Sequence, residues 1–141
     1  MNIAENAQSR CGARLTVLII ENHAASLALL QDFLQARFPP WKIISAENAA
    51  EAVALSITRR PFFALADINL PDANGIDLAA ALLEQRGDLR VIMVSVQDSA
   101  LHRSLASAAG TAGYVRKDRI PLELEPLLGR LLEEAGEGVR Q

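Results

Sequence analysis

A run of five apolar residues that ends on a single carboxylate constrains the fold of this chain more than any other stretch. The run, Phe62–Ala66, comes directly after Pro61 and is too short for a helix of its own, so it predicts a strand buried on both faces. Turn-forming residues follow Asp67, and apolar residues at helical spacing resume from Ile76. Asp67 is therefore expected at the carboxyl end of a central parallel strand, where open α/β sheets place their ligands. A carboxylate there is placed to bind a cation or to act as a nucleophile.

Strand-like and helical patterns alternate along the rest of the chain. Strands are predicted over residues 15–20, 41–46, 62–66, 89–95 and 112–116. Helices are predicted between them, over about 23–38, 47–58, 76–87 and 98–109, with a last one from 120 to about 134. The alternation implies one parallel sheet with helices on both faces and right-handed crossovers. The 41–46 strand is less uniformly apolar and is expected near an edge of this sheet.

Two local details are predicted in the first two helices. Asn22 directly follows the first strand and is a residue type that caps helices, so it is expected to cap the first helix. The second helix is expected to turn four apolar residues inward: Ala50, Val53, Ala54 and Ile57.

The length of 141 residues favours a single domain with a core of its own. Residues 1–13 are predicted to be a flexible leader, 14–134 the domain, and 135–141 a polar tail or the beginning of a linker. A net charge of −3 argues against a broad electrostatic grip on nucleic acid or on an anionic membrane. One cysteine, Cys11, excludes an internal disulfide, and no apolar run approaches the roughly 20 residues of a membrane span. We therefore expect a soluble, cytoplasmic protein.

Polar residues end the predicted strands, and the carboxyl ends of parallel strands meet on one rim of a sheet. In order and spacing, these residues resemble the receiver domain of two-component response regulators. The resemblance covers about Leu15 to Leu132 and rests on the following features: Glu21-Asn22 after the first strand, Asp67 followed by Leu70-Pro71 and Gly75, Ser95 after the fourth strand, and Lys117 three residues beyond Tyr114. It implies a flavodoxin-like (βα)5 three-layer sandwich, with a five-stranded parallel sheet in the order 2-1-3-4-5.

The resemblance also implies a role for each residue of the rim. Asp67 would be the nucleophile that takes a phosphoryl group from a histidine kinase, a phosphotransfer protein or a small donor such as acetyl phosphate. Mg²⁺ would be the cofactor, with these ligands: Glu21, Asn22, Asp67 and the main-chain carbonyl of Asn69. Lys117 would pair with a phosphate oxygen, and the Ser95 hydroxyl would hydrogen-bond the phosphoryl group.

The same resemblance implies how phosphorylation is read out. Tyr114 would rotate as the loop after Ser95 moves, changing the surface formed by the 98–109 helix, the 112–116 strand and the last helix. That surface would regulate a downstream output domain or protein, and it is a possible homodimer interface. Asn69 and Gln97 match positions that tune the lifetime of the acyl phosphate. Self-phosphorylation and self-dephosphorylation at Asp67 would be the only chemistry, so an enzyme acting on a second substrate is not expected.

The chain departs from the family pattern at one position of the metal site. Asn22 stands where the family normally has an aspartate that touches the metal, and an amide oxygen brings no negative charge. Weaker metal affinity and slower phosphorylation are expected. The alternative interpretation is an atypical receiver that acts as a phosphorylation-independent interaction module. A smaller departure is Asp118, where many members carry a proline.

Other classes fit the residues less well. An aspartyl phosphatase would need a second acid two residues after its nucleophile, where this chain has Asn69, and a flavin binder would need a phosphate-cradling loop where this chain has Glu21. His23 is interpreted as a surface residue of the first helical turn. Direct nucleic-acid binding and membrane binding are not expected of this segment. The sequence leaves open whether it is a stand-alone receiver or the front part of a longer regulator with a helix-turn-helix output domain.

Overall fold

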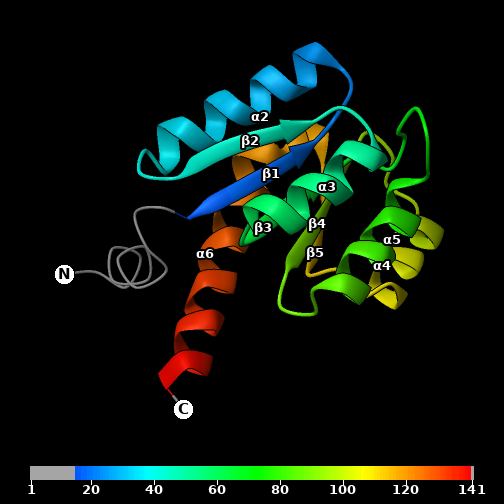
Figure 1. Ribbon diagram of the computed structural model, residues 1–141. Helices are drawn as coiled ribbons and strands as arrows, with labels where there is room; N and C mark the ends of the chain where they lie inside the picture. Colours follow the sequence, from blue (N-terminus) through cyan, green and yellow to red (C-terminus); the bar gives the residue numbers. More distant parts are fainter. Residues whose placement is uncertain (1–14, 141) are drawn as a thin grey trace.

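The computed structural model describes residues 15–140 (Figure 1), so the predicted leader at 1–13 lies outside the described residues. Strands and helices alternate as predicted. The strands are β1 (Thr16–Ile20), β2 (Lys42–Ala46), β3 (Phe63–Ala66), β4 (Arg90–Ser95) and β5 (Gly113–Arg116). The helices are α2 (Ala24–Arg37), α3 (Ala49–Arg59), α4 (Gly75–Gln85), α5 (Ala100–Ala108) and α6 (Ile120–Arg140), with a 3₁₀ turn, η1 (Lys117–Arg119), before the last.

The five strands form one sheet in the order β2-β1-β3-β4-β5, and every neighbouring pair is parallel. The predicted flavodoxin-like topology and strand order are therefore confirmed, and β2 lies at an edge as expected. β3, which carries Asp67 at its end, is the central strand. All four of its residues are buried, because a central parallel strand is covered by helices on both faces.

Two apolar layers cover the two faces of the sheet. Alternate residues of β1 divide between them: Val17 and Ile19 pack with α2 and α6, whereas Leu18 and Ile20 pack with α3, α4 and α5. This alternation follows from the two-residue period of a strand. The result is a three-layer sandwich in which both helical layers hold the strand ends in fixed positions.

The last helix is longer than its sequence predicts. We expected α6 to end near Glu134, but it continues to Arg140. Ala135 is half-buried and Gly136 is buried, so the helix still packs on the domain just beyond the predicted end. No helix within residues 15–140 is both long and apolar enough to cross a membrane.

Two predicted details of the early helices are wrong. Asn22 does not cap α2, because the N-cap position is His23 and its side chain makes no capping hydrogen bond. The buried face of α3 consists of small residues, Ala49, Ala52 and Ser56. Of the four residues predicted to point inward, Val53 is half-buried against the core, whereas Ala50 and Ala54 are exposed and Ile57 is 56% exposed. Asn48 caps α3 by accepting the Glu51 N–H at 2.8 Å. The small side chains allow α3 to lie close to the sheet, a preference that hydrophobic periodicity alone does not reveal.

Candidate functional site

Asp67 directly follows β3 and is held between the two layers of helices. Its N–H donates to the carbonyl of Ile20 at 3.1 Å, which continues the ladder between β3 and β1 by one residue. The side chain is 5% exposed. A buried carboxylate at this place needs a cation or hydrogen-bond donors around it, because burial without them costs several kcal/mol.

The loop after Asp67 folds tightly back beneath it. The Gly75 N–H donates to the carbonyl of Ile68 at 2.6 Å, and a Cβ at position 75 would lie 1.9 Å from the Asp67 carbonyl oxygen. Only glycine fits this approach. Asn74 then caps α4, since its side-chain oxygen accepts the N–H of Ile76 at 2.8 Å.

Asp72 ties the same loop to a second helix. Its two carboxylate oxygens accept the N–H groups of Ala49 at 2.8 Å and Ala50 at 3.1 Å, at the start of α3. These bonds lower the pKa of Asp72 below its ordinary value. The sequence identified Asp72 only as a turn former. Its partners lie more than twenty residues away, so no local pattern could have revealed them.

Lys117 supplies the cation. It lies in the 3₁₀ turn after β5, and its Nζ is 3.2 Å from Asp67 Oδ2 and 2.5 Å from Glu21 Oε1. Nζ also donates to the Ser26 hydroxyl at 3.3 Å. The structure thus brings together three of the predicted site residues, which come from the ends of β1, β3 and β5. Two carboxylates share one ammonium group, so the cluster keeps a net charge of −1 when all three are ionised.

The two carboxylates respond oppositely to this environment. Burial and the neighbouring negative charge of Glu21 raise the pKa of Asp67, against the opposing effect of Lys117. Burial would also raise the pKa of Glu21, but the hydrogen bond and charge of Lys117, with the His23 N–H, lower it below its ordinary value. Glu21 is therefore the partner that holds its negative charge most firmly.

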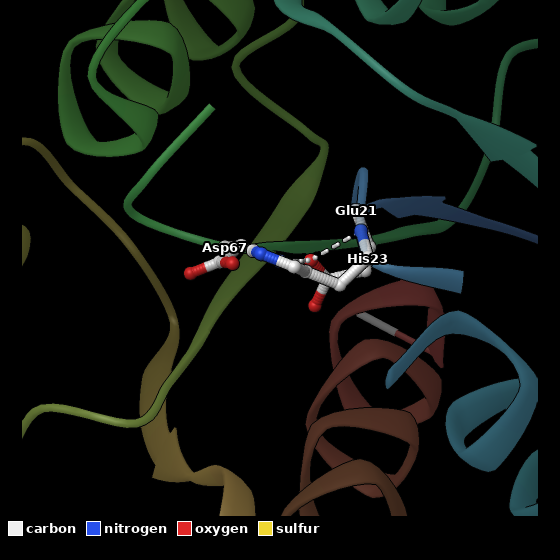
Figure 2. Close-up of side chains that lie close together, drawn as sticks. All are labelled: Glu21, His23 and Asp67. Carbon is white, nitrogen blue, oxygen red and sulfur yellow. Dashed lines mark hydrogen bonds and ion pairs between the residues drawn. The ribbon is translucent and has the colours of Figure 1, made fainter. Parts of the chain in front are cut away.

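His23 joins this cluster, which the sequence did not predict. As expected, it lies at the surface with its side chain 66% exposed. Its Nδ1, however, is 3.3 Å from Glu21 Oε2, and Figure 2 shows the imidazole extending from the start of α2 toward Asp67. Donor atoms of Glu21, His23 and Asp67 all lie within 4.8 Å of one another. The sequence feature that could have indicated this contact is the position of His23, two residues after Glu21.

The other predicted metal ligands flank the cluster. The Asn69 N–H donates to Asp67 Oδ1 at 3.3 Å, which places its main chain beside the carboxylate. Asn22 follows Glu21, and its side chain is exposed. A hard divalent cation such as Mg²⁺ prefers oxygen ligands, and two carboxylates with a net negative charge suit it. The donor set therefore fits the metal, with the amide of Asn22 as its weakest member.

The remaining predicted residues form a second group at the ends of β4 and β5. Ser95 is fully buried, and its hydroxyl accepts the Gln97 N–H at 3.1 Å. The Tyr114 hydroxyl donates to the Gln97 carbonyl at 2.7 Å. Arg103 of α5 lies over the Tyr114 ring, 4.7 Å from its centroid, and also pairs with Asp98. These contacts link the loop after Ser95 to the surface of α5 and β5.

Comparisons with known proteins agree with this geometry. The family model for the response regulator receiver domain matches residues 17–128. The DNA-binding transcriptional activator DevR/DosR of Mycobacterium tuberculosis is 34% identical over 123 residues, covering 86% of this chain and 54% of that protein. The acid tolerance regulatory protein ActR of Rhizobium meliloti is 29% identical over 128 residues, covering 91% of this chain and 63% of that protein. The chain thus spans about half to two thirds of the length of these relatives.

The fold is also found in solved structures. A CheY-like response regulator receiver domain protein from Methanospirillum hungatei superposes with a TM-score of 0.80 at 26% identity, covering 89% of this chain and 98% of that one. A LuxR-family response regulator from Aurantimonas superposes with a TM-score of 0.78 at 22% identity, covering 84% of this chain and 85% of that one.

Proposed function

Because the chain belongs to the response regulator receiver domain family, we propose that it is a signalling switch that accepts a phosphoryl group on Asp67. The observation that carries the proposal is a buried carboxylate with an ammonium group 3.2 Å away, at the end of the central strand. A carboxylate that served only to cap a turn would not require Lys117 to be brought from β5.

The chemistry follows from the charges around Asp67. A carboxylate oxygen of Asp67 forms a bond to phosphorus, while the bond from phosphorus to the donor's imidazole nitrogen or acyl oxygen breaks and the donor keeps the electron pair. The bound phosphoryl group adds roughly one to two negative charges. Lys117 therefore moves from the Asp67 carboxylate to an oxygen of that group. Glu21 keeps the other side of Lys117 in place. When bound by Glu21, Asn22, Asp67 and the Asn69 carbonyl, Mg²⁺ would neutralise charge on the phosphoryl oxygens.

Signal output would pass from Ser95 to the α5–β5–α6 face. The phosphoryl group would draw the Ser95 hydroxyl toward it, at the expense of its bond to the Gln97 N–H. Because the Gln97 carbonyl also holds the Tyr114 hydroxyl, a shift of this loop would release or reposition the ring and the Arg103 side chain above it. Asn69 and Gln97 would tune the lifetime of the acyl phosphate.

The α5–β5–α6 face is the proposed partner surface. Leu122 is exposed in the first turn of α6, and Val96 is exposed in the loop before α5. Leu101 and Leu105 are also exposed on α5, although Leu105 lines a groove between α5 and α4. Exposed large apolar groups often mark a protein-binding site, so we propose that the surface around α5 and α6 contacts an output domain or protein, or a second copy of the chain. The phosphoryl donor would be a histidine kinase or phosphotransfer protein of the cytoplasm. We expect no nucleic-acid binding from this segment, although DevR/DosR is a DNA-binding activator.

Intact-protein mass spectrometry tests the switch. The chain is incubated with acetyl phosphate and Mg²⁺ beside two variants, Asp67→Asn and Asn22→Asp. We expect a phosphoryl mass gain in the native chain that is absent from Asp67→Asn and, at subsaturating Mg²⁺, faster in Asn22→Asp. A mass gain that persists in Asp67→Asn would refute Asp67 as the acceptor.

Asn22 favours a second candidate function, a phosphorylation-independent interaction module. In that case Lys117 would serve as the permanent cation of a metal site that has lost a charged ligand. The same experiment separates the two candidates, since the module predicts no mass gain in the native chain but a clear gain in Asn22→Asp.

A further inference from the structure

We propose that His23 is a metal ligand, and that together with Glu21 and Asp67 it gives the site a preference for divalent ions that bind imidazole, with Zn²⁺ as the probe, over Mg²⁺. The inference deepens the proposed function. It rests on that function only where it concerns the role of the metal in signalling. The metal binding itself is independent of phosphorylation and can be measured without it.

The geometry already suits one ion between His23 and Glu21. Two ligand atoms that bind one ion at about 2.1 Å lie about 3.0 to 3.4 Å from each other. The distance from His23 Nδ1 to Glu21 Oε2 is 3.3 Å. Asp67 completes a group whose donor atoms lie within 4.8 Å of one another, so a small rotation of its side chain would bring it into the same coordination shell.

Lys117 leaves the required oxygen accessible. It pairs with Oε1 of Glu21 and Oδ2 of Asp67, whereas His23 faces the other Glu21 oxygen, Oε2. An ion can therefore bind on the His23 side while the lysine remains on its own side. The His23 side chain is 66% exposed, which gives the ion a path from solvent.

The donor types decide which ion is favoured. Mg²⁺ takes oxygen ligands almost exclusively, so the uncharged Asn22 weakens its binding and His23 adds little. Zn²⁺ and its neighbours in the first transition row accept imidazole nitrogen together with carboxylate oxygen. Compared with the family pattern, the site has Asn22 in place of an aspartate and gains His23 as a nitrogen ligand. Both differences favour Zn²⁺ over Mg²⁺.

Zinc titration by calorimetry tests the proposal on the full chain. The background is Cys11→Ser, because a thiol also binds zinc. The chain has two histidines, so His102→Gln, on α5, is the matched control for His23→Gln. We expect His23→Gln to weaken Zn²⁺ binding at least tenfold and Mg²⁺ binding less than twofold, while His102→Gln changes neither. Equal Zn²⁺ affinity in the native and His23→Gln chains, or an equal loss in both variants, would overturn the proposal.

Histidine NMR adds a direct readout. The ring nitrogens of two histidines give two sets of signals, and Zn²⁺ is expected to shift those of His23 and leave those of His102. The opposite pattern contradicts the proposal. Failure of the proposed function looks different: His23-dependent zinc binding without an Mg²⁺-dependent phosphoryl mass gain would refute the switch alone. A mass gain with zinc binding that does not depend on His23 would refute this inference alone.

Discussion

Lys117 should stabilise the fold mainly by separating two buried carboxylates, and Lys117→Met tests this. The substitution keeps most of the aliphatic stem and removes the ammonium group that lies 2.5 Å from Glu21 and 3.2 Å from Asp67. The carboxylates, whose nearest donor atoms lie within 4.8 Å, then face each other without it. At an effective dielectric constant of about 20, two like unit charges at that separation repel by about 3.5 kcal/mol. The native chain carries the same repulsion, but the attraction of Lys117 to both carboxylates offsets it. Removing one partner of a buried ion pair typically costs about 3–5 kcal/mol, so we expect a loss of about 3 kcal/mol in the free energy of unfolding.

Urea unfolding at pH 7.5 with a chelator, followed by circular dichroism, gives that free energy for four chains: the native chain, Lys117→Met, Asp67→Asn and the double variant. In the double variant Glu21 is the one carboxylate left of the pair, so the repulsion is gone. Its free energy of unfolding should therefore exceed that of Lys117→Met by at least about 2 kcal/mol. If it is as unstable as Lys117→Met, the lysine acts through the packing of its stem and the electrostatic account is wrong. A matching recovery of Lys117→Met on addition of Mg²⁺ is expected, since the ion replaces the missing positive charge.

Three further substitutions test the loop and the charges around Asp67. Gly75→Ala should lower the free energy of unfolding by at least about 2 kcal/mol, because its Cβ would overlap the Asp67 carbonyl oxygen. Gly129→Ala in α6, with nothing within 4 Å of the new Cβ, is the control and should stabilise by about 0.5–1 kcal/mol. Asp72→Ala should lower the melting temperature because the N–H groups of Ala49 and Ala50 at the start of α3 lose their acceptors. An unchanged value would show that water solvates these two N–H groups equally well. The raised pKa of Asp67 means that the folded chain holds the proton more tightly than the unfolded chain, so this group's contribution to stability falls as pH rises from about 4. The stability of Asp67→Asn relative to the native chain should therefore increase with pH in metal-free urea titrations, and a difference independent of pH would contradict the raised pKa.

The sequence predicted the convergence of the site because parallel strands end on a common rim. Glu21, Asp67 and Lys117 are 46 and 50 residues apart along the chain, yet each directly follows a predicted strand. The strand order makes β1 and β3 neighbours, and the long side chain of Lys117 reaches Glu21 and Asp67 from β5, past the end of β4. The prediction needed only the strand boundaries and the topology. The strand boundaries followed from short apolar runs that are bounded by turn formers and alternate with helical patterns, whereas the strand order was implied by the resemblance to receiver domains.

Other features depended on side-chain packing, which periodicity does not encode. The inward face of α3 was predicted from the helical spacing of Ala50, Val53, Ala54 and Ile57, but the fold buries Ala52 and leaves Ile57 exposed. The end of α6 was predicted from glycines, whereas the helix continues through Gly136, which is buried. His23 was predicted to be a surface residue, and it is exposed. That prediction did not indicate how near its ring lies to Glu21. Each of these depends on how closely two elements approach, and a single sequence gives no distance.

The charges of the rim indicate which step the Asn22 position should control. Glu21, Asp67 and Lys117 together carry −1, and an aspartate at position 22 would make that −2. A divalent ion is attracted less strongly to −1 than to −2, so the asparagine weakens the binding of the ion. Once the ion is bound, however, the site with Asn22 carries +1 rather than 0, and an anionic phosphoryl donor meets less repulsion. Asn22→Asp should therefore lower the Mg²⁺ concentration needed for half-maximal phosphorylation without raising the rate at saturating Mg²⁺. A variant that is faster at every Mg²⁺ concentration would mean that residue 22 acts on the transfer itself, and that the weakness of this site lies in its geometry rather than in its charge.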